Sequence, residues 1–468
     1  MAIVPPPPVS CRLAIPPEHL ASVIGSWPEP ALLESGPGFA TAGRWSLLTA
    51  RPRFVFEATG DKCAVRTPDG RTTLTIGDPL QALGRYLDTY GLADPRDTPD
   101  PELPPFQGGL VGFFGYDLAP RLERLPRRAP RESALPDVRF ALYDTVVTVD
   151  HLKGDVVLWA YDLLDEGYAA TARRGREWSK ALAKQRPAPA RTTALSPLRS
   201  NFTYEGYLDA ARRALEYIAA GDVFQVNLSQ RFHCVGKPAP LDLYLRLKER
   251  SPAPFSTFLA WENAAVVSAS PEWFYQTRGD AIVTRPIKGT RPRGASHDDD
   301  ERLAAELAQS PKDRAELTMI VDLERNDLGR VCRYGTVRVS EALTVETFAQ
   351  VHHLVATVEG RLRPETAPMD IVRALFPGGS ITGAPKIRAM EIIDELEPTR
   401  RSLYTGAIGY FSRGGTSAFN IAIRTMLIEG NLISFQAGGG IVADSDPETE
   451  YHETLHKARG MRAVIEET

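Results

Sequence analysis

Residues 405–437, TGAIGYFSRGGTSAFNIAIRTMLIEGNLISFQA, indicate the fold class most directly. Three runs of apolar, β-branched and aromatic residues are separated by two short glycine-containing segments that favour tight turns. The runs are residues 405–411, 418–428 and 432–437, and the turns lie at Gly414-Gly415 and Gly430-Asn431. Three strands in succession, with no helix between them, predict an antiparallel meander.

The same pattern extends upstream of the meander. Three more strands are predicted for residues 264–269, 272–277 and 281–287, joined by turns at Ser270-Pro271 and Arg278-Gly279-Asp280. Helices are predicted for residues 204–220 up to Gly221, for the segment that Ser310-Pro311 opens, and from about Pro447 onward. Because the strands come in runs and do not alternate with helices, we expect an α+β fold with antiparallel β-sheets.

A change in composition at residues 186–200 divides the chain. This stretch, RPAPARTTALSPLRS, is rich in Pro, Ala, Thr and Arg and has no apolar period, which predicts a linker or an exposed crossing. Residues 1–185 alternate short apolar runs with turns and predict a sheet-rich N-terminal region. Residues 201–468 are predicted to form the domain that carries the chemistry.

The composition excludes several classes of protein. Of 468 residues, 43% are hydrophobic and 24% are charged, which excludes extensive disorder. A formal net charge of −4 gives no positive field for a nucleic acid. Four scattered cysteines fit neither a zinc site nor a disulfide framework, and no apolar stretch approaches the roughly 20 residues of a membrane helix. The N-terminal proline run lacks the features of a signal peptide. We therefore expect a soluble, cytoplasmic protein.

Two predicted helices each present a pair of carboxylates on one face. Asp313 and Glu316 are three residues apart, as are Glu450 and Glu453, which Lys457 follows one turn later. Acids from two helices could hold Mg²⁺, which takes a few carboxylates together with water and substrate oxygens. Each pair also has a structural alternative: Asp313 would complete a helix capping box, and Glu453 would pair with Lys457.

Two glycine-rich segments offer backbone N–H groups to an anion. Residues 376–386, FPGGSITGAPK, precede a predicted helix but lack the lysine of a phosphate loop, so we expect no nucleotide site. A helix N-terminus suits a carboxylate equally well, and residues 436–441, QAGGGI, offer a second backbone nest. Arg424, on the predicted strand face of Asn420 and Ala422, would point into the same cleft. These features favour a small substrate with more than one carboxylate, with tight turns as the alternative.

Glu272 and Lys288 are predicted to face each other across a hairpin. If the chain turns at Arg278-Gly279-Asp280, their side chains are cross-strand neighbours about 5 Å apart at Cβ. Pro286 could break the ladder before Lys288. A lysine that faces a carboxylate is usually an ion pair, whereas a lysine removed from water can serve as a nucleophile.

Five longer motifs occur together along the chain. They are SPEWF from Ser270, RPIKGTRPRG from Arg285, DRAELTMIVDLERNDLGRV from Asp313, FPGGSITGAPKIRAMEII from Phe376 and GGGIVADSDPETEYHETLHKA from Gly438. On these motifs the chain closely resembles the chorismate-utilising enzymes, and among them the large components of aminodeoxychorismate synthases. The resemblance covers residues 200–468 and extends more weakly upstream, through LLESG from Leu32, GRWSLL from Gly43 and PFQGGLVGFFGYDL from Pro105. It implies a two-lobed sandwich of antiparallel sheets with helices packed outside, an N-terminal region like that of anthranilate synthase component I, and a chorismate-binding catalytic domain at residues 201–468.

The resemblance also implies roles for the residues that match its motifs. The expected Mg²⁺ cofactor would be bound by Glu316 and Glu453, with Asp313 and Glu450 as further members of the metal site. The substrate and its carboxylates would be received by Arg424, Tyr404, Lys457, Gly438, Gly439, Gly440, Thr290 and Gln225. His353 matches an active-site histidine, although by itself it reads as a core strand histidine. Residues near Glu34, Ser35 and Ser46, with residues 252–255, match a pocket that holds tryptophan in some relatives.

Two positions select the reaction within the family. Members that add water to chorismate carry a lysine base where Gln225 stands, and anthranilate synthases usually carry a small residue where Lys288 stands. A lysine there is the mark of the aminodeoxychorismate-forming members, which catalyse a transaminase-type amination. The resemblance implies that neutral Lys288 attacks C2 of the ring while Glu272 protonates the departing C4 hydroxyl. Ammonia then attacks C4 and expels the lysine.

The resemblance further implies a partner for the chain. No glutaminase-like cysteine motif is present, so we expect a separate glutamine amidotransferase subunit, in a heterodimer, to supply ammonia. No additional domain for pyruvate release is expected, so the product would be 4-amino-4-deoxychorismate, a precursor of p-aminobenzoate and folate. The first alternative is an anthranilate synthase component I of tryptophan biosynthesis. The second, from a different class, is a non-catalytic protein that binds tryptophan or scaffolds a glutaminase.

Overall fold

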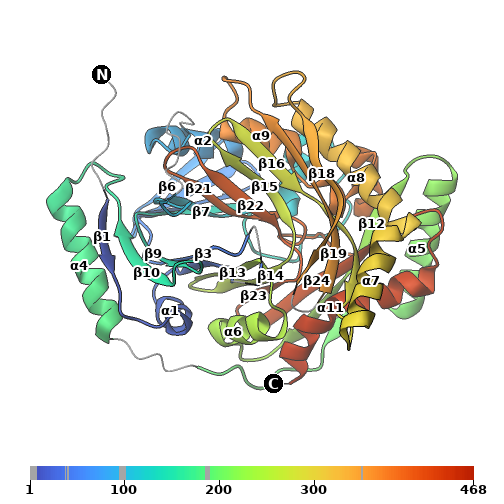
Figure 1. Cartoon of the computed structure of the whole chain (residues 1–468), viewed down its shortest axis with the longest axis horizontal. Helices are drawn as coiled ribbons and strands as arrows, with labels where there is room; N and C mark the ends of the chain where they lie inside the picture. The colour runs from blue at the N-terminus through green and yellow to red at the C-terminus, as the bar shows by residue number, and fades with distance from the viewer. Residues whose placement is uncertain are drawn as a thin grey trace.

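Two large antiparallel β-sheets, packed against each other with helices outside them, make up the fold in the computed structural model (Figure 1). The structure describes residues 8–36, 38–39, 42–93, 102–184, 190–348 and 351–467. Within these ranges each sheet has twelve strands. The α+β class and the two-lobed sandwich with helices outside are confirmed.

The first sheet takes strands from both ends of the chain. The order of hydrogen-bonded neighbours is β1 (Val9–Arg12), β10 (Asp155–Ala160), β9 (Thr145–Asp150), β3 (Trp45–Thr49), β2 (Ala31–Glu34), β13 (Phe255–Trp261), β14 (Ala264–Ser270), β23 (Thr425–Glu429), β24 (Leu432–Ile441), β12 (Gln225–Val235) and β11 (Arg199–Ser200). The short strand β20 (Gly383–Ala384) also pairs with β12.

The second sheet is built in the same way. Its order is β17 (Ile287–Pro292), β19 (Val351–Arg361), β16 (Ala281–Arg285), β15 (Trp273–Arg278), β22 (Ser417–Ile421), β21 (Ala407–Ser412), β7 (Gly109–Phe114), β8 (Val138–Tyr143), β4 (Phe54–Thr59), β5 (Lys62–Arg66) and β6 (Thr72–Ile76). The long strand β18 (Arg338–Thr347) pairs with β19.

The N-terminal and C-terminal parts of the chain share these sheets and their core. In the first sheet β2 pairs with β13, and in the second β7 pairs with β21. Aromatic rings from both parts pack together with centroids 4.8 to 6.2 Å apart; they belong to Phe114, Phe140, Phe411 and Phe419. The boundary expected at residues 186–200 therefore does not divide either sheet.

The described part of that boundary segment lies along the first sheet. Thr193 forms an isolated bridge with Lys237, and β11 pairs with β12. Residues 186–189 lie outside the described ranges. From residue 190 onward the segment is an extension of the sheet at its edge.

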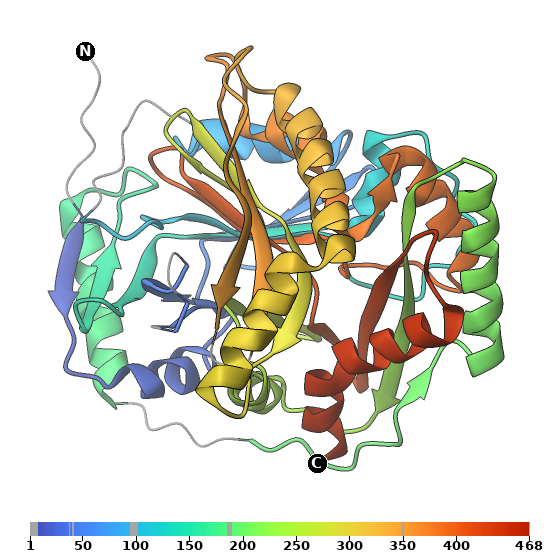
Figure 2. The same ribbon diagram turned by 45° about the vertical axis from the view of Figure 1, so that its right-hand side comes forward.

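Helices cover the outer faces of the sandwich. They are α1 (Pro17–Ile24), α2 (Pro79–Thr89), α3 (Ala119–Leu122), α4 (Tyr168–Lys184), α5 (Tyr204–Ala219), α6 (Pro240–Arg250), α7 (His297–Gln309), α8 (Pro311–Gly329), α9 (Pro368–Leu375), α10 (Lys386–Leu396) and α11 (Pro447–Glu466), with 3₁₀ turns η1 (Tyr116–Leu118) and η2 (Gly379–Ile381). Figures 1 and 2 show α4 at one end of the molecule and α5 with α11 at the other. Among the helices of the described ranges, none is long and apolar enough to span a bilayer.

The predicted helix boundaries are confirmed where capping signals define them. α8 begins at Pro311, and Ser310 Oγ accepts the backbone N–H of Asp313 at 3.3 Å. α5 ends before Gly221, whose φ of +82° is a conformation that glycine adopts without strain. The last helix begins at Pro447 as expected.

The predicted meander of residues 405–437 is wrong in one respect. Both glycine turns are present, but the expected strand 418–428 is two strands, β22 and β23. β22 belongs to the second sheet and β23 to the first, so the chain passes from one sheet to the other between them. The apolar pattern does not reveal this crossing, because residues on both sides of it are buried.

The crossing changes the position of Arg424. Ile423 N–H donates to the Ile421 carbonyl at 2.8 Å, and Arg424 follows with a φ of +50°. Arg424 therefore lies in a tight bend and shares no strand face with Asn420 and Ala422, contrary to the prediction. Its side chain is directed by the bend and not by the alternation of a strand.

Candidate active site

Lys288 lies on β17, at the edge of the second sheet, where β17 pairs with β19. The predicted pairing of Lys288 with Glu272 across one hairpin is wrong. The β15–β16 hairpin turns where expected, but it places Arg285 opposite Trp273 and ends there. Pro286, which has no N–H to give to a ladder, separates this hairpin from β17.

Glu272 nevertheless lies close enough to Lys288 for their charges to interact. The residue is only 5% exposed, and its carboxyl lies near the backbone N–H of Ile287 and near Ser380, whose Oγ has no hydrogen-bond partner within the described residues. Burial raises the pKa of Glu272 above its usual range, and Ser380, Lys288 and the Ile287 N–H offset part of that rise. Within the described residues Oε1 of Glu272 has no hydrogen-bond partner. A buried acid thus keeps one oxygen available to a ligand.

The amine of Lys288 is largely withdrawn from water. Its side chain is 13% exposed, and Nζ lies 3.9 Å from Oε2 of Glu316. Burial lowers the pKa of Lys288 below its usual value, the charges of Glu316, Glu272 and Glu453 oppose that change, and Lys457 adds to it. Losing the proton therefore costs Lys288 less free energy here than in water, and the unprotonated amine is the nucleophilic form.

The carboxylates of Glu316 on α8 and Glu453 on α11 both act on Lys288. Nζ of Lys457 lies 2.6 Å from Oε1 of Glu453 and donates to the Gly438 carbonyl at 3.1 Å. Burial alone would raise the pKa of Glu453, but Lys457 and Lys288 outweigh it and hold that pKa below its usual range. The predicted pair of Glu453 with Lys457 is confirmed, and this side of the site keeps its acid ionised.

Glu450, one turn before Glu453 on α11, is buried and 3% exposed. Ser445 donates its hydroxyl to Oε1 of Glu450 at 2.6 Å, whereas Oε2 has no partner within the described part of the chain. Burial raises the pKa of Glu450, and Ser445 offsets part of that rise. Gly439 makes room for this carboxyl, since a Cβ there would lie 2.8 Å from Oε2.

Asp313 is engaged in an ion pair with Arg291. Its Oδ2 lies 3.2 Å from Nη2 of Arg291, and the Ser310 N–H that a capping box would use donates to the Leu307 carbonyl. Across the described ranges, no three His, Cys, Asp or Glu side chains cluster closely enough to hold a metal ion together. The four acids expected at the metal site therefore do not form one cluster.

The glycine run of residues 438–440 lies within β24, opposite residues 227–229 of β12. The predicted backbone nest is wrong, because successive peptide groups of a strand point in opposite directions and do not converge on one anion. Glycine is needed here because neighbouring side chains lie too close to the strand for a Cβ to fit. A Cβ at Gly440 would lie 2.9 Å from Nε2 of Gln225.

Gln225 and Tyr404 are buried polar side chains beside this strand. Gln225 is fully buried, and within the described residues neither atom of its amide has a partner. The Tyr404 hydroxyl lies against the backbone N–H of Gly438, and burial raises the pKa of Tyr404. Since an unpartnered buried amide costs free energy, a ligand or water that bonded to Gln225 would recover it.

His353 and Arg424 meet on the same side of the site. Nδ1 of His353 lies 2.9 Å from the Thr290 hydroxyl. Burial, and then the charge of Arg424, lower the pKa of His353 to about 4, so this imidazole is neutral at pH 7. Burial also lowers the pKa of Arg424, while the charge of Glu272 opposes that change. The bend between the two sheets thus brings Arg424 to the predicted residues by a route that a strand face does not provide.

The glycine loop of residues 376–386 directs polar groups to the protein's own side chains. A Cβ at Gly379 would lie 3.5 Å from Oε1 of Glu324 on α8, and Nζ of Lys386 lies 2.5 Å from Oδ2 of Asp327. The anion expected at this loop is thus an internal acid. Sequence reasoning missed Glu324 and Asp327, although their spacing of three residues on a predicted helix was available as a signal.

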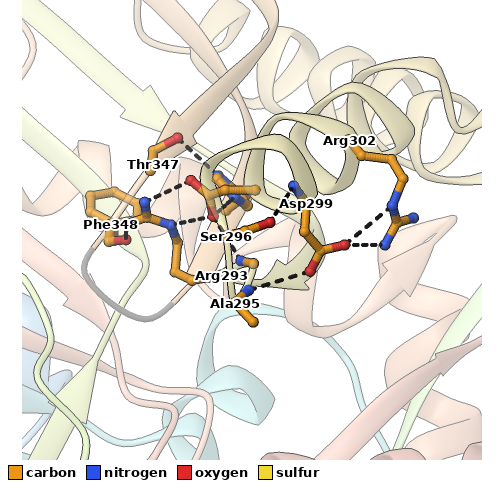
Figure 3. A network of polar contacts seen from close by, with 10 residues as sticks. Arg293, Ala295, Ser296, Asp299, Arg302, Thr347 and Phe348 are labelled. Atoms are coloured by element: carbon orange, nitrogen blue, oxygen red, sulfur yellow. Dashed lines mark hydrogen bonds and ion pairs between the residues drawn. The ribbon is translucent and has the colours of Figure 1, made fainter.

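A polar network secures the segment that follows the Lys288 strand (Figure 3). Ser296 Oγ accepts the N–H of Asp299 at the start of α7, and Asp299 pairs with Arg302 at 2.7 Å. Arg293 donates to the carbonyl of Phe348, at the end of β18, at 2.8 Å. The connection from β17 to α7 is therefore held at both of its ends.

A separate cavity of about 300 Å³ lies among β2, β3, β13, β15 and β22. Its lining includes Glu34, Ser35, Phe255, Trp273 and Asn420. Tyr244 and Lys248 each lie 2.6 Å from the Glu34 carboxylate, and the Ser35 N–H donates to Ser46 Oγ. Of the residues that match the tryptophan pocket of some relatives, Glu34, Ser35 and residues 254–255 therefore line a cavity, whereas Ser46 and residues 252–253 do not.

The chain is similar along almost its whole length to proteins of known function. The chorismate binding enzyme family matches residues 48–463. The chain is 43% identical over 449 residues to aminodeoxychorismate synthase component 1 of Escherichia coli (strain K12), covering 96% of each protein. It is also 40% identical over 471 residues to anthranilate synthase component 1 of Synechocystis sp., covering 95% of this chain and 92% of that protein.

The solved structures show the same relationship. Anthranilate synthase component I from Streptococcus pneumoniae TIGR4 aligns with a TM-score of 0.80 at 32% identity, covering 92% of this chain and 93% of that one. The relatives carry the names of two different reactions on one fold, so the residues of the site have to distinguish them.

Proposed function

This chain belongs to the chorismate binding enzyme family, and on that premise we propose that it is the large component of an aminodeoxychorismate synthase. In this proposal chorismate and ammonia give 4-amino-4-deoxychorismate and water, a step toward p-aminobenzoate and folate. One observation carries most of the support: a buried amine, Lys288, lies 3.9 Å from the Glu316 carboxylate and interacts with the buried acid Glu272.

Lys288 is the proposed nucleophile. Its unprotonated amine attacks C2 of the ring, the ring double bond shifts, and the C4–O bond breaks. Glu272 gives its proton to the departing oxygen, which leaves as water. Ammonia then attacks C4, the bond between C2 and Lys288 breaks, and the lysine leaves as a neutral amine. The surplus proton on the new amino group returns to Glu272, which restores both residues.

Glu316 and Glu453 are the proposed ligands of Mg²⁺. They come from different helices and both act on Lys288, and Glu450 beside them has a buried oxygen without a partner in the described residues. Two carboxylates with water and substrate oxygens are sufficient for this ion. Bound Mg²⁺ would neutralise and orient a substrate carboxylate. Lys457 keeps Glu453 ionised for this role, and Asp313 remains with Arg291.

The remaining predicted residues are proposed to bind and orient chorismate. Arg424 and Lys457 supply positive charge for its carboxylates. The Tyr404 hydroxyl and the Gln225 amide supply hydrogen bonds from buried positions. The glycines at residues 438–440 let the Gln225 and Glu450 side chains lie close to the strand, at the proposed binding surface. His353, neutral and fixed by Thr290, would hydrogen-bond to substrate without adding charge.

A separate glutamine amidotransferase is the proposed source of ammonia. The relatives named component 1 imply a second component. If the proposal is correct, the isolated chain forms product from ammonium salts, and it uses glutamine only when such a partner is added. Use of glutamine by the isolated chain would contradict this part of the proposal.

Anthranilate synthase activity is the second candidate, because relatives of that name match the chain nearly as well. In that reaction ammonia attacks C2 directly, and Lys288 forms no bond to the substrate. The two candidates therefore differ in product and in their need for the lysine.

The deciding experiment replaces Lys288 with Ala and measures products from chorismate, ammonium and Mg²⁺ by chromatography with fluorescence detection. We expect 4-amino-4-deoxychorismate as the main product of the native chain and a fall of about 10³-fold or more in the variant. Lys312→Ala is the matched control, because Lys312 lies 4.0 Å from the other oxygen of Glu316 but is 59% exposed. Anthranilate as the main product, formed equally well without Lys288, would overturn the proposal.

A further inference from the structure

Arg401, in the segment between α10 and β21, is a buried arginine that has no part in the mechanism given above. It is 1% exposed, and it forms an ion pair with Glu397, which follows α10 and is 5% exposed. Nε donates to Oε2 of Glu397 at 2.9 Å and Nη2 donates to Oε1 at 2.6 Å, so the pair is bidentate. Oε1 also accepts the backbone N–H and the hydroxyl of Ser229, at 2.9 and 2.8 Å. The pair therefore joins the end of α10 to β12.

The guanidinium of Arg401 reaches the chain at three further points. Nη1 donates to the Ile381 carbonyl of η2 at 3.0 Å and to the Thr405 hydroxyl at 3.3 Å. Nη2 donates to the Asn227 carbonyl of β12 at 2.7 Å. With the two bonds to Glu397 these contacts use all five N–H donors of an arginine side chain. A lysine, with three donors on one nitrogen, could not make this set of contacts.

The turn of residues 402–405, directly after Arg401, has a strained backbone. Ser402 has a φ of +54° and Thr405 a φ of +60°, and for a β-branched residue such as threonine this conformation is rare and costly. A residue keeps a strained conformation only where the surrounding structure holds it. The Thr405 hydroxyl is held by Arg401, and its N–H donates to the Ala422 carbonyl at 2.9 Å. Arg401 is therefore one of the restraints on this turn.

The turn carries one proposed substrate ligand and adjoins the bend that carries another. Tyr404 belongs to the turn, and its ring centroid lies 5.6 Å from Cζ of Arg401. Beyond the turn, the Ala422 N–H donates to the Gly406 carbonyl at 2.8 Å. Ala422 lies two residues before Arg424, whose φ is +50°. Backbone hydrogen bonds thus join the turn that Arg401 holds to the bend of Arg424.

We propose that Arg401 is a positioning residue for substrate binding. Its guanidinium holds the turn of residues 402–405, so that Tyr404 and, through Ala422, Arg424 stay in place for chorismate. The inference rests on the proposed function for the roles of Tyr404 and Arg424, but the contacts of Arg401 do not depend on it. Because all five of its N–H groups are bonded to the protein, Arg401 itself does not touch substrate.

The first test is Arg401→Lys, which keeps the charge beside Glu397 and loses the five-donor fork. We expect the KM for chorismate to rise about tenfold or more and kcat to stay within about threefold, because the turn and the bend carry binding groups. Arg400→Lys is the matched control. It makes the same exchange one residue earlier, where Nε donates to the Ala129 carbonyl, and it should leave KM within about twofold.

A double-mutant cycle separates positioning from a loss of stability. Tyr404→Phe should raise the KM about fivefold or more in the native chain but less than about twofold in Arg401→Lys, where the hydroxyl is already out of place. Lys457→Met, on α11, should raise the KM by the same factor in both backgrounds. An effect of Tyr404→Phe that is equally large in both backgrounds would overturn the proposal.

Hydrogen exchange provides a measurement that is independent of activity. The amides of Thr405 and Ala422 join the turn to the bend, and in Arg401→Lys they should exchange about tenfold faster or more. The amides that pair β4 with β5 should change by less than about twofold. Unchanged exchange at Thr405 and Ala422 would show that the turn does not need Arg401. Equal acceleration in all these strands would show a general loss of stability, and either result would overturn the proposal.

A second variant covers the case in which Arg401→Lys does not fold. Glu397→Gln keeps the shape of the pair but removes its negative charge, and we expect the same local rise in exchange and in KM at a reduced size. A uniform acceleration of exchange in that variant would also overturn the proposal. If the native chain neither binds nor consumes chorismate, the proposed function fails, and hydrogen exchange alone still decides whether Arg401 holds the turn.

Discussion

The two sides of the candidate site differ in how they treat charge. On the β-sheet side, Lys288 is 13% exposed and Glu272 is 5% exposed, and burial shifts both pKa values toward the neutral forms. On the helical side, the side chains of Glu453 and Lys457 are 42% and 45% exposed and form a pair at 2.6 Å, and Lys457 holds the pKa of Glu453 below its usual range. The sheet side suits bond making and proton transfer, and the helical side suits a metal ion and an anionic substrate.

The difference shows that burial, and not the residue type, sets the task of each group. Two lysines and several glutamates share the site, yet Lys288 near the sheet is 13% exposed and has a lowered pKa, whereas Lys457 on α11 is 45% exposed. Sequence alone does not assign these states, because exposure depends on packing between distant segments. Four experiments test whether the two sides are as separate as their burial indicates.

Glu272→Gln should give the largest effect, because it removes the proton that leaves with the C4 oxygen. We expect kcat to fall about 10²- to 10⁴-fold with little change in the KM for chorismate. Steady-state kinetics with ammonium as the nitrogen source measures both constants. A higher KM with unchanged kcat would place Glu272 among the binding groups and would erase the contrast between the two sides.

Glu316→Gln and Glu453→Gln should change the requirement for metal. The Mg²⁺ concentration for half-maximal activity is expected to rise about tenfold or more, because each variant loses an ionised oxygen ligand. Calorimetric titration with Mg²⁺ checks binding directly. Asp313→Asn is the control and should have a smaller effect, since Asp313 is occupied by Arg291. Equal effects in all three variants would show that Asp313 is a ligand as well.

Lys457→Met should weaken substrate binding and leave the chemistry intact. Loss of one exposed positive charge is expected to raise the KM for chorismate about tenfold, equivalent to about 1.4 kcal/mol, with kcat within about twofold. The effect should shrink at high salt, because an exposed charge is screened. A kcat that falls as far as in Glu272→Gln would contradict the separation of tasks.

Lys288→Met should give the smallest effect, a gain in folding stability. The pKa of Lys288 is lower in the folded chain, so below its usual value of 10.5 protonation favours the unfolded chain, and the buried lysine destabilises the fold at neutral pH. We expect the free energy of unfolding to rise by about 1 kcal/mol at pH 7, and this gain to disappear as the pH approaches 10.5. Urea denaturation at several pH values measures it.

The exposed lysine provides the comparison for that stability measurement. Lys457→Met should change the free energy of unfolding by less than about 1 kcal/mol at any pH, because exposed ion pairs contribute little. A stability gain in Lys457→Met that matched the gain in Lys288→Met would show that burial does not distinguish the two lysines.

Local signals in the sequence predicted much of the fold. Helix starts at Pro311 and Pro447 and the turns at Gly279-Asp280 and Gly414-Gly415 depend on neighbours only a few residues away, so they could be predicted. The crossing at residues 422–424 could not, because a strand buried in one sheet and a strand buried in another have the same apolar pattern.

In the candidate site, too, the arrangements that depend on distant segments were not predicted correctly. Lys288 and Glu272 are brought close because β16 and β17 both pair with β19, and not through the expected hairpin, so the pair was predicted for the wrong geometric reason. The nest expected at residues 438–440 is a regular strand, because glycine there serves close approach, which sequence does not distinguish from a turn. Glu324 was missed because an acid in a helix is normally a solvated one.

The shared sheets also have a consequence for synthesis on the ribosome. β2 and β7 are synthesised early. Their pairing partners β13 (Phe255–Trp261) and β21 (Ala407–Ser412) leave the ribosome much later. Until then the nascent chain presents open strand edges and unburied phenylalanines, which are the surfaces that chaperones engage and that drive aggregation. Expression of residues 1–185 alone would therefore yield an insoluble fragment and not a free-standing module.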